Sequence, residues 1–153
     1  MSIEEKILEL CLELPPPSPQ GGIYKSVLVI DGLAYFSGHG PYKSDGTLYL
    51  GKVGDEVDQE FATQAARQTG LAILANMKKY IGSLNRVKRV VKLLGLVNSA
   101  PDFHAHPAVI NGCSELFAEI FGEDNGIGTR SAFGVTALPG NMTVEIEGIF
   151  EVS

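Results

Sequence analysis

The chain has 153 residues, 44% of them hydrophobic and 20% charged, and its formal net charge is −6. This length and composition are typical of one globular domain with its own core, and they exclude a disordered chain. The negative charge argues against sequence-independent nucleic-acid binding, which needs clustered Lys and Arg, and no apolar run reaches the roughly 20 residues of a membrane span.

The two cysteines and the N-terminus indicate the cellular environment. Cys11 and Cys113 make neither a disulfide framework nor a metal-ligand set. The acidic start of the chain lacks the basic and apolar regions of a signal peptide. We therefore expect a cytoplasmic protein.

The first residues predict a short helix followed by an extended connector. Ser2 and Glu5 have the spacing of a capping box, in which each side chain bonds to the other residue's backbone N–H. Apolar residues then recur at helical spacing at Ile3, Ile7, Cys11 and Leu14. Residues 15–22 are rich in proline and glycine and cannot continue the helix. We therefore divide the chain into an accessory helix and connector over residues 1–21 and one domain over residues 22–153.

The middle of the chain predicts strands and helices in alternation. Residues 24–30 and 33–37 are strand candidates, joined by the hairpin signal Asp31-Gly32, and residues 47–50 predict a further short strand. Apolar periodicity predicts a helix from about residue 58 to 80, ended by Gly82. Residues 86–98, rich in Val and Leu, predict a long strand. A second helix begins near Pro107 and ends at Gly122.

The last part of the chain predicts a β-hairpin. Residues 129–137 and 142–151 are strand candidates on either side of Pro139-Gly140, a pair that favours a type II turn. The whole chain thus predicts an α+β domain in which two helices cover one face of a sheet.

Pairing the two hairpin strands outward from the turn places charged residues on one face. In this register Arg130 shares a face with Glu145 and Glu147, and the neighbouring residues Ala132 and Gly134 are small. One interpretation is a solvated face with a surface ion pair worth about 0–1 kcal/mol. The other is a pocket in which the planar fork of the arginine binds a carboxylate through two parallel hydrogen bonds. Spacing alone leaves both interpretations open.

Several segments resemble the RidA/YjgF family of small imine deaminases, a family also described as endoribonuclease L-PSP. The C-terminal signature lies in residues 128–131 (Gly-Thr-Arg-Ser), 135–140 (Val-Thr-Ala-Leu-Pro-Gly) and 144–149 (Val-Glu-Ile-Glu-Gly-Ile). Residues 37–41 (Ser-Gly-His-Gly-Pro) resemble the family's Ser-Gly-Gln-X-Pro turn. Asp102-Phe103, Asn111 and Glu115 resemble its second helix. The resemblance covers about residues 22–152.

The resemblance implies a chorismate-mutase-like fold, with a mixed sheet and two helices on one face, and a homotrimer with active sites between subunits. It implies cofactor-independent and metal-independent hydrolysis of reactive 2-imino or enamine acids, such as 2-aminoacrylate and 2-iminobutanoate, to 2-oxo acids and ammonia. The implied partners are therefore a small carboxylate substrate and further copies of the chain, with no nucleic acid or membrane.

Matching the family motifs residue by residue implies roles for six positions. Arg130 matches the arginine that binds the substrate carboxylate, and Glu145 matches the glutamate that directs the attacking water. The substrate-binding positions implied by the resemblance are Tyr24, Ser37, Gly38, Asn111 and Arg130.

Two departures from the family pattern define alternatives. Position 132 is Ala where many active members carry Cys, and His39 replaces the usual Gln. These differences, with the longer N-terminus, indicate a divergent subgroup. The competing hypotheses are a non-catalytic trimer that binds a small carboxylate and, less favoured because of the net charge, an endoribonuclease.

Overall fold

The computed structural model describes residues 1–153 and contains one five-stranded sheet in the order β1-β2-β5-β3-β4. The strands are β1 (Val27–Ile30), β2 (Leu33–His39), β3 (Val87–Asn98), β4 (Thr129–Val135) and β5 (Val144–Val152). The helices are α1 (Ile3–Glu9), α2 (Gln59–Ile81), α3 (His106–Phe121) and α4 (Glu123–Gly126), with short 3₁₀ turns at Leu84–Arg86 and Pro139–Asn141. The β3–β4 pair is parallel and the other three pairs are antiparallel, so the sheet is mixed.

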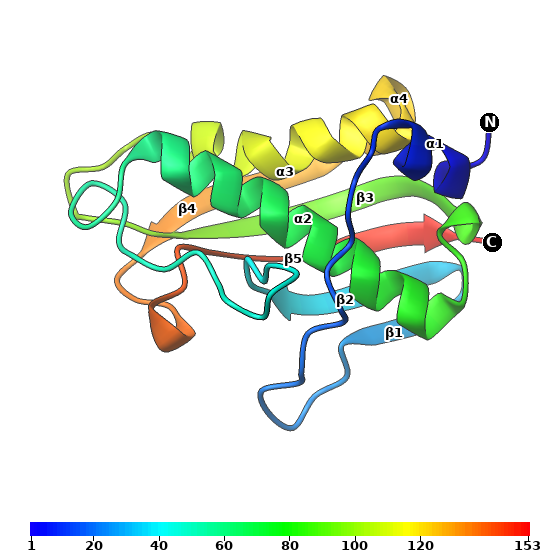
Figure 1. The fold of residues 1–153 in the computed structure, drawn as a ribbon, viewed down its shortest axis with the longest axis horizontal. Helices are drawn as coiled ribbons and strands as arrows, with labels where there is room; N and C mark the ends of the chain where they lie inside the picture. The colour runs from blue at the N-terminus through cyan, green and yellow to red at the C-terminus, as the bar shows by residue number, and fades with distance from the viewer.

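Helices α2 and α3 lie side by side on one face of this sheet, and the other face carries no helix (Figure 1). The predicted α+β class and the placement of two helices on one face are confirmed. The core lies between the two layers, where Phe117 of α3 packs edge-on against Phe150 of β5. No helix in the structure combines the length and apolarity that crossing a membrane requires.

Local sequence signals identified most elements correctly. Ser2 and Glu5 form the predicted capping box, and Asp31-Gly32 turns between β1 and β2 with both residues at positive φ. Helix α2 begins and ends as predicted, with Gly82 as its C-cap, and Asp58 caps its start. Two extents differ. Helix α1 ends at Glu9, because Cys11 adopts a left-handed φ of 55°, and residues 47–50 make isolated bridges rather than a strand.

The predicted C-terminal hairpin is wrong. Strands β4 and β5 both exist, but β3 lies between them and pairs parallel to β4 and antiparallel to β5. Gly140 does adopt the left-handed conformation that its turn needs, with φ 62° and ψ 17°. The chain after this turn crosses to the far side of β3 instead of folding back on β4.

Close approach of the two main helices depends on two glycines. A Cβ on Gly112 of α3 would overlap the backbone carbonyl of Thr63 in α2, and a Cβ on Gly70 of α2 would lie 2.8 Å from a methyl carbon of Leu116. Glycine lets the helix backbones approach more closely than any other residue would. This contact fixes the position of α2 relative to α3. It thereby also fixes the position of the side chains that α2 directs toward the sheet.

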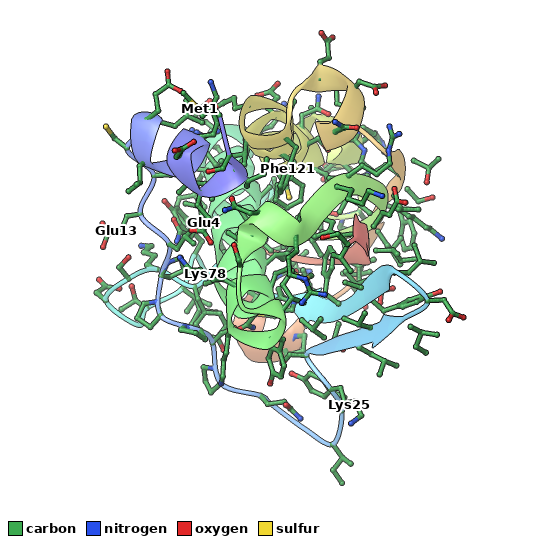
Figure 2. The ribbon with its side chains drawn as sticks, turned by 90° about the vertical axis from the view of Figure 1, so that its right-hand side faces the viewer. Met1, Glu4, Glu13, Lys25, Lys78 and Phe121 are labelled. Atoms are coloured by element: carbon green, nitrogen blue, oxygen red, sulfur yellow. The ribbon has the colours of Figure 1, made fainter.

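The N-terminal segment lies against the outer surface of α2 (Figure 1). Glu4 of α1 pairs with Lys78 of α2 at 2.8 Å and accepts the backbone N–H of Leu84 at 3.1 Å (Figure 2). Ile7 of α1 is 6% exposed and belongs to the main hydrophobic core. The predicted boundary between residues 21 and 22 is not tested by these contacts and stays a prediction.

Candidate functional site

The two residues expected to act together, Arg130 and Glu145, project from opposite faces of the sheet. Arg130 of β4 pairs with Leu93 of β3, and Leu93 pairs on its other side with Gly148 of β5. Glu145 of β5 pairs with Leu96, which lies three residues after Leu93 on β3. Side chains alternate between faces along a strand, so Arg130 lies on the helix face and Glu145 on the open face. The predicted shared face of Arg130, Glu145 and Glu147 is therefore wrong, because it assumed direct pairing of β4 with β5.

Arg130 contacts helix α3 from the helix face of β4. Its Nη1 atom donates to Oδ1 of Asn111 at 2.8 Å and to Oγ of Ser114 at 3.1 Å, and its Nη2 atom donates to the Pro107 carbonyl at 3.4 Å. The structure thus brings together Arg130 and Asn111, two of the predicted site residues. Both line a cavity of about 430 Å³ that also includes Glu115 and the loop 126–129.

All three partners of Arg130 are electrically neutral. The ion pairs in the chain involve five other basic side chains, and none includes Arg130. An arginine in this arrangement is oriented by its neighbours while its positive charge stays uncompensated. Such a group is suited to an anion, because the guanidinium fork matches the geometry of a carboxylate.

Glu145 lines a second cavity, of about 590 Å³, at the end of β2. This cavity also holds Tyr24, Ser37 and Gly38, so the structure brings together the other four predicted site residues. Burial, and secondarily the charge of Glu147, raises the pKa of Glu145 above the ordinary glutamate value. A carboxyl group with a raised pKa is better matched to accepting and returning a proton near neutral pH.

The backbone beside Glu145 contains a β-bulge. Phe36 pairs with Gly148 and His39 pairs with Ile146, so three steps along β2 correspond to two along β5. Ser37 and Gly38 are the residues inside this bulge. Bulges redirect side chains and expose backbone groups, and they are frequent next to active sites. Here Ser37 and Gly38, the two residues of the bulge, both line the Glu145 cavity.

Sequence reasoning missed a hydrogen-bonded pair of side chains in this cavity, His39 and Asn76. His39 entered only as a departure from the family pattern, and Asn76 was not considered, since it lies in the middle of α2. Both are almost fully buried, at 4% and 3% exposed, and their side chains meet at 2.8 Å. The signal available in the sequence was an asparagine on the apolar stripe of a helix, which requires a buried polar partner.

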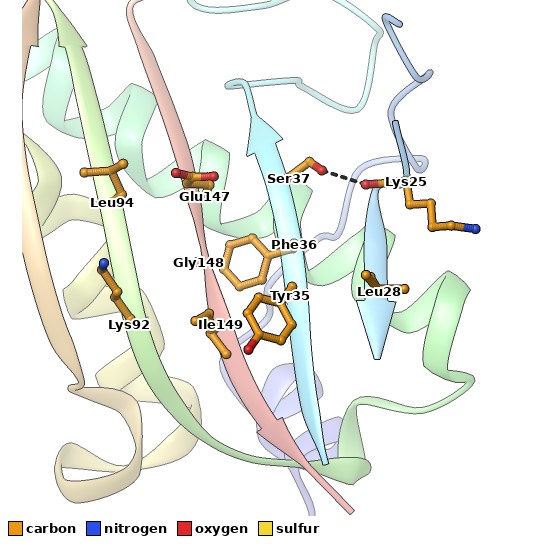
Figure 3. A pocket seen from close by; sticks show the side chains of 10 residues that line it. All are labelled: Lys25, Leu28, Tyr35, Phe36, Ser37, Lys92, Leu94, Glu147, Gly148 and Ile149. Atoms are coloured by element: carbon orange, nitrogen blue, oxygen red, sulfur yellow. Dashed lines mark hydrogen bonds between the residues drawn. The ribbon is translucent and has the colours of Figure 1, made fainter. Parts of the chain in front are cut away.

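A third hollow, which we call the open-face groove, lies on the helix-free side of the sheet (Figure 3). Leu28, Tyr35 and Ile149 present apolar surface there, with Lys92 and Glu147 at its margin. Leu28 and Tyr35 are 43% and 42% exposed, and Phe133 on β4 is 48% exposed. Large apolar side chains gathered on one face are typical of a protein–protein contact. No group of three or more His, Cys, Asp or Glu that could hold a metal ion occurs in the structure.

The sequence matches, over residues 4–147, the family described as "YjgF/chorismate mutase-like, putative endoribonuclease". The chain belongs to the RidA/YjgF family. Its chorismate-mutase-like fold agrees with the mixed sheet and its two covering helices.

Solved structures of RidA/YjgF-like proteins fall at two levels of similarity. Protein Atu1372 of Agrobacterium tumefaciens, of unknown function, is 38% identical with a TM-score of 0.88 and covers 99% of this chain and 94% of its own. A "putative endoribonuclease" of Shewanella oneidensis MR-1 is 28% identical with a TM-score of 0.93, and the match covers 99% of this chain and 100% of that protein's chain. RidA of the Antarctic bacterium Psychrobacter sp. PAMC 21119 is 26% identical with a TM-score of 0.62, covering 92% and 96%. The first two share nearly the whole fold of this chain.

Proposed function

We propose that this RidA/YjgF protein hydrolyses reactive 2-imino and enamine acids to 2-oxo acids and ammonia without a cofactor. The observation that carries the proposal is the environment of Arg130. Its guanidinium donates hydrogen bonds to neutral groups of Asn111, Ser114 and Pro107 and pairs with no carboxylate. A small substrate with one carboxylate supplies the missing anion. Family membership supports the reaction class, and 2-aminoacrylate and 2-iminobutanoate are the substrates we would test first.

In the proposed reaction Glu145 acts on water. Its carboxylate accepts a proton as the water oxygen bonds to C2 of the imine, and Glu145 then passes this proton to the imine nitrogen to give a carbinolamine. The hydroxyl proton of the carbinolamine then moves through Glu145 to the amino nitrogen, the C–N bond breaks to release ammonia, and the C2–O bond becomes the carbonyl of the 2-oxo acid. A raised pKa suits Glu145 to this exchange of protons. In this proposal, backbone groups of the Ser37-Gly38 bulge, which line the same cavity as Glu145, bind the substrate.

The proposed site is shared between subunits of a homotrimer. Arg130 and Glu145 face opposite sides of one sheet, so a single copy does not bring them to one substrate. A second copy that contributes the other residue removes this obstacle. Two features support such packing: the apolar open-face groove, and β4, which has no neighbouring strand on its outer side. Closed ring symmetry repeats the same contact around a trimer.

The test measures ammonia and 2-oxo acid released from an imino acid generated in the assay. The parent protein should raise the rate above spontaneous hydrolysis, and Arg130→Ala should abolish most of this increase. Arg67→Ala is a matched control, because Arg67 forms a partly exposed ion pair with Glu119 on the outside of α2 and α3. Product release by Arg130→Ala at the parental rate would show that the mechanism is wrong.

A non-catalytic carboxylate-binding protein is the second candidate. It is favoured by the same uncompensated Arg130, which would bind a stable carboxylate equally well, and by the family departures Ala132 and His39. Isothermal titration with a panel of 2-oxo acids distinguishes the two functions. Binding that is lost in Arg130→Ala, without turnover of imino acids by the parent, would favour the binding protein.

A further inference from the structure

A chain of three hydrogen-bonded side chains connects the N-terminal segment to the Glu145 cavity. Asn76 of α2 donates through Nδ2 to Ser18 Oγ at 3.1 Å and contacts Nε2 of His39 at 2.8 Å. On its other side, Nδ1 of His39 lies 2.5 Å from the carbonyl oxygen of Ser37. Ser18, Asn76 and His39 all line the cavity that contains Glu145.

These contacts determine the protonation of His39. A carbonyl oxygen only accepts hydrogen bonds, so Nδ1 of His39 carries a proton and donates it to Ser37. Nε2 faces the amide group of Asn76, which donates, so Nε2 holds a lone pair. The imidazole is therefore neutral with its proton on Nδ1, and both hydrogens of the Asn76 amide group are used.

The Ser37 carbonyl held by His39 belongs to the bulge beside Glu145. The other polar groups of Ser37 are also fixed: its backbone N–H donates to the Ser26 carbonyl at 3.0 Å, and its Oγ donates to the Lys25 carbonyl at 2.6 Å. His39 makes the bond that orients the peptide between Ser37 and Gly38. Without it the Ser37 carbonyl loses its side-chain hydrogen bond.

We propose that His39, held by Asn76 and Ser18, is a positioning residue that fixes the Ser37-Gly38 bulge against Glu145. It acts through the backbone of this bulge. Ser18 is the last member of this hydrogen-bonded series, so the N-terminal segment contributes directly to the proposed site. Pro19 and Gly21 of the same segment also line the cavity, so the placement of this segment sets one wall of the proposed substrate pocket.

The first test is spectroscopic and independent of activity. The ¹⁵N resonances of the His39 imidazole should show the proton on Nδ1 in the parent protein. Asn76→Asp replaces the donor by a carboxylate, so Nε2 should gain a proton and the ring should become doubly protonated at neutral pH. A parent ring with its proton on Nε2 would overturn the proposal.

The second test follows the bulge itself. Amide hydrogen exchange at Gly38 should become about tenfold faster in Asn76→Ala, with a smaller change of the same sign in Ser18→Ala. Asn85→Ala is the control, because it removes a hydrogen bond to the Glu4 backbone N–H outside the cavity. If Asn76→Ala fails to fold, Ser18→Ala still decides, since Ser18 is only partly buried. Unchanged exchange in the folded variants contradicts the proposal.

The third test uses turnover and rests on the proposed function. Asn76→Ala should lower kcat about tenfold with little change in KM, because misplacement of the bulge affects the reacting groups more than binding. His39→Gln should recover activity relative to His39→Leu, since glutamine still carries one donor and one acceptor. A parent protein without turnover would refute the proposed function, while the imidazole and exchange measurements would still decide the positioning role. Equal kcat in His39→Leu and the parent would refute the positioning role alone.

Discussion

The carboxylate of Glu145 occupies the space that a side chain on Gly38 would need. A Cβ built on Gly38 overlaps Oε2 of Glu145 and lies 2.9 Å from the carboxyl carbon. The glycine has no positive φ, so space rather than backbone conformation requires it. The bulge and the carboxylate are therefore fitted to each other, and this fit leads to the first prediction.

Gly38→Ala should displace the Glu145 carboxylate and lower kcat about 100-fold, because a shift of about 1 Å in a reacting group has an effect of this size. The fold should survive, since the clash involves the end of a flexible side chain. The measurement is turnover of a generated imino acid, with far-UV circular dichroism to check the fold. Gly22→Ala is the control, because a Cβ there meets Tyr24 at an ordinary 3.5 Å. Equal turnover in Gly38→Ala and the parent would show that the position of Glu145 is unimportant.

Arg130→Lys should lower kcat/KM by about 10- to 100-fold although it keeps the positive charge. Lysine lacks the planar fork that bonds to a carboxylate through two donors, and a hydrogen bond to a charged group contributes about 1.5–3 kcal/mol. Asn111→Ala should give a smaller decrease, because it releases only one of the three contacts that orient the guanidinium. Steady-state kinetics with 2-iminobutanoate measures both effects. A larger loss in Asn111→Ala than in Arg130→Lys would contradict the assigned roles.

Local signals in the sequence predicted most of the fold, and the main exception is the order of the strands. The capping box at Ser2, the Asp31-Gly32 turn and the glycine at position 82 each act within a few residues, and the structure confirms them. The order of strands depends on contacts far apart in sequence. A Pro-Gly turn fixes the local chain direction, but it does not prevent β3 from lying between the strands on either side.

The same limit explains what could be predicted of the site. Family motifs located Arg130 and Glu145, but their relative faces followed from a strand pairing that does not occur. The chain of Ser18, Asn76 and His39 joins an irregular segment, a helix and a strand. No periodic pattern relates three such positions, so only the folded structure brings them together.

Glu147→Gln should shift the pH dependence of activity toward lower pH. The charge of Glu147 adds to burial in raising the pKa of Glu145, so removing this charge lowers that pKa. Glu145 must be ionised to accept a proton from water, and activity therefore falls as pH decreases through its pKa. The acid limb of kcat/KM should move to lower pH by a modest amount, because burial is the larger cause. A shift in the opposite direction would exclude Glu145 as the general base.

His39 should make folding stability depend on pH in mildly acidic solution. Burial lowers the pKa of His39 below the ordinary histidine value. The unfolded chain then binds a proton more readily than the folded one, so the stabilisation is complete above about pH 6.5 and decreases as pH falls toward the folded pKa. Urea unfolding of His39→Gln should show a weaker decrease than the parent between about pH 7.5 and about pH 5.5. A residual decrease is expected from His106, whose pKa is lowered by burial and by His104.

Two inactive variants should restore activity when their subunits are mixed. If each site takes Arg130 from one copy and Glu145 from another, an Arg130→Ala chain still supplies Glu145, and a Glu145→Gln chain still supplies Arg130. In a randomly assembled equimolar mixture, each of the two residues is intact in half of the chains. About one quarter of the sites therefore contain both an intact Arg130 and an intact Glu145. The two variants are unfolded and refolded together, and the turnover is compared with that of each variant refolded alone. A site contained within one subunit predicts no recovery, because every chain in the mixture lacks one of the two residues. Recovery to about one quarter of parental turnover therefore supports both the shared site and the opposite placement of Arg130 and Glu145 on the sheet.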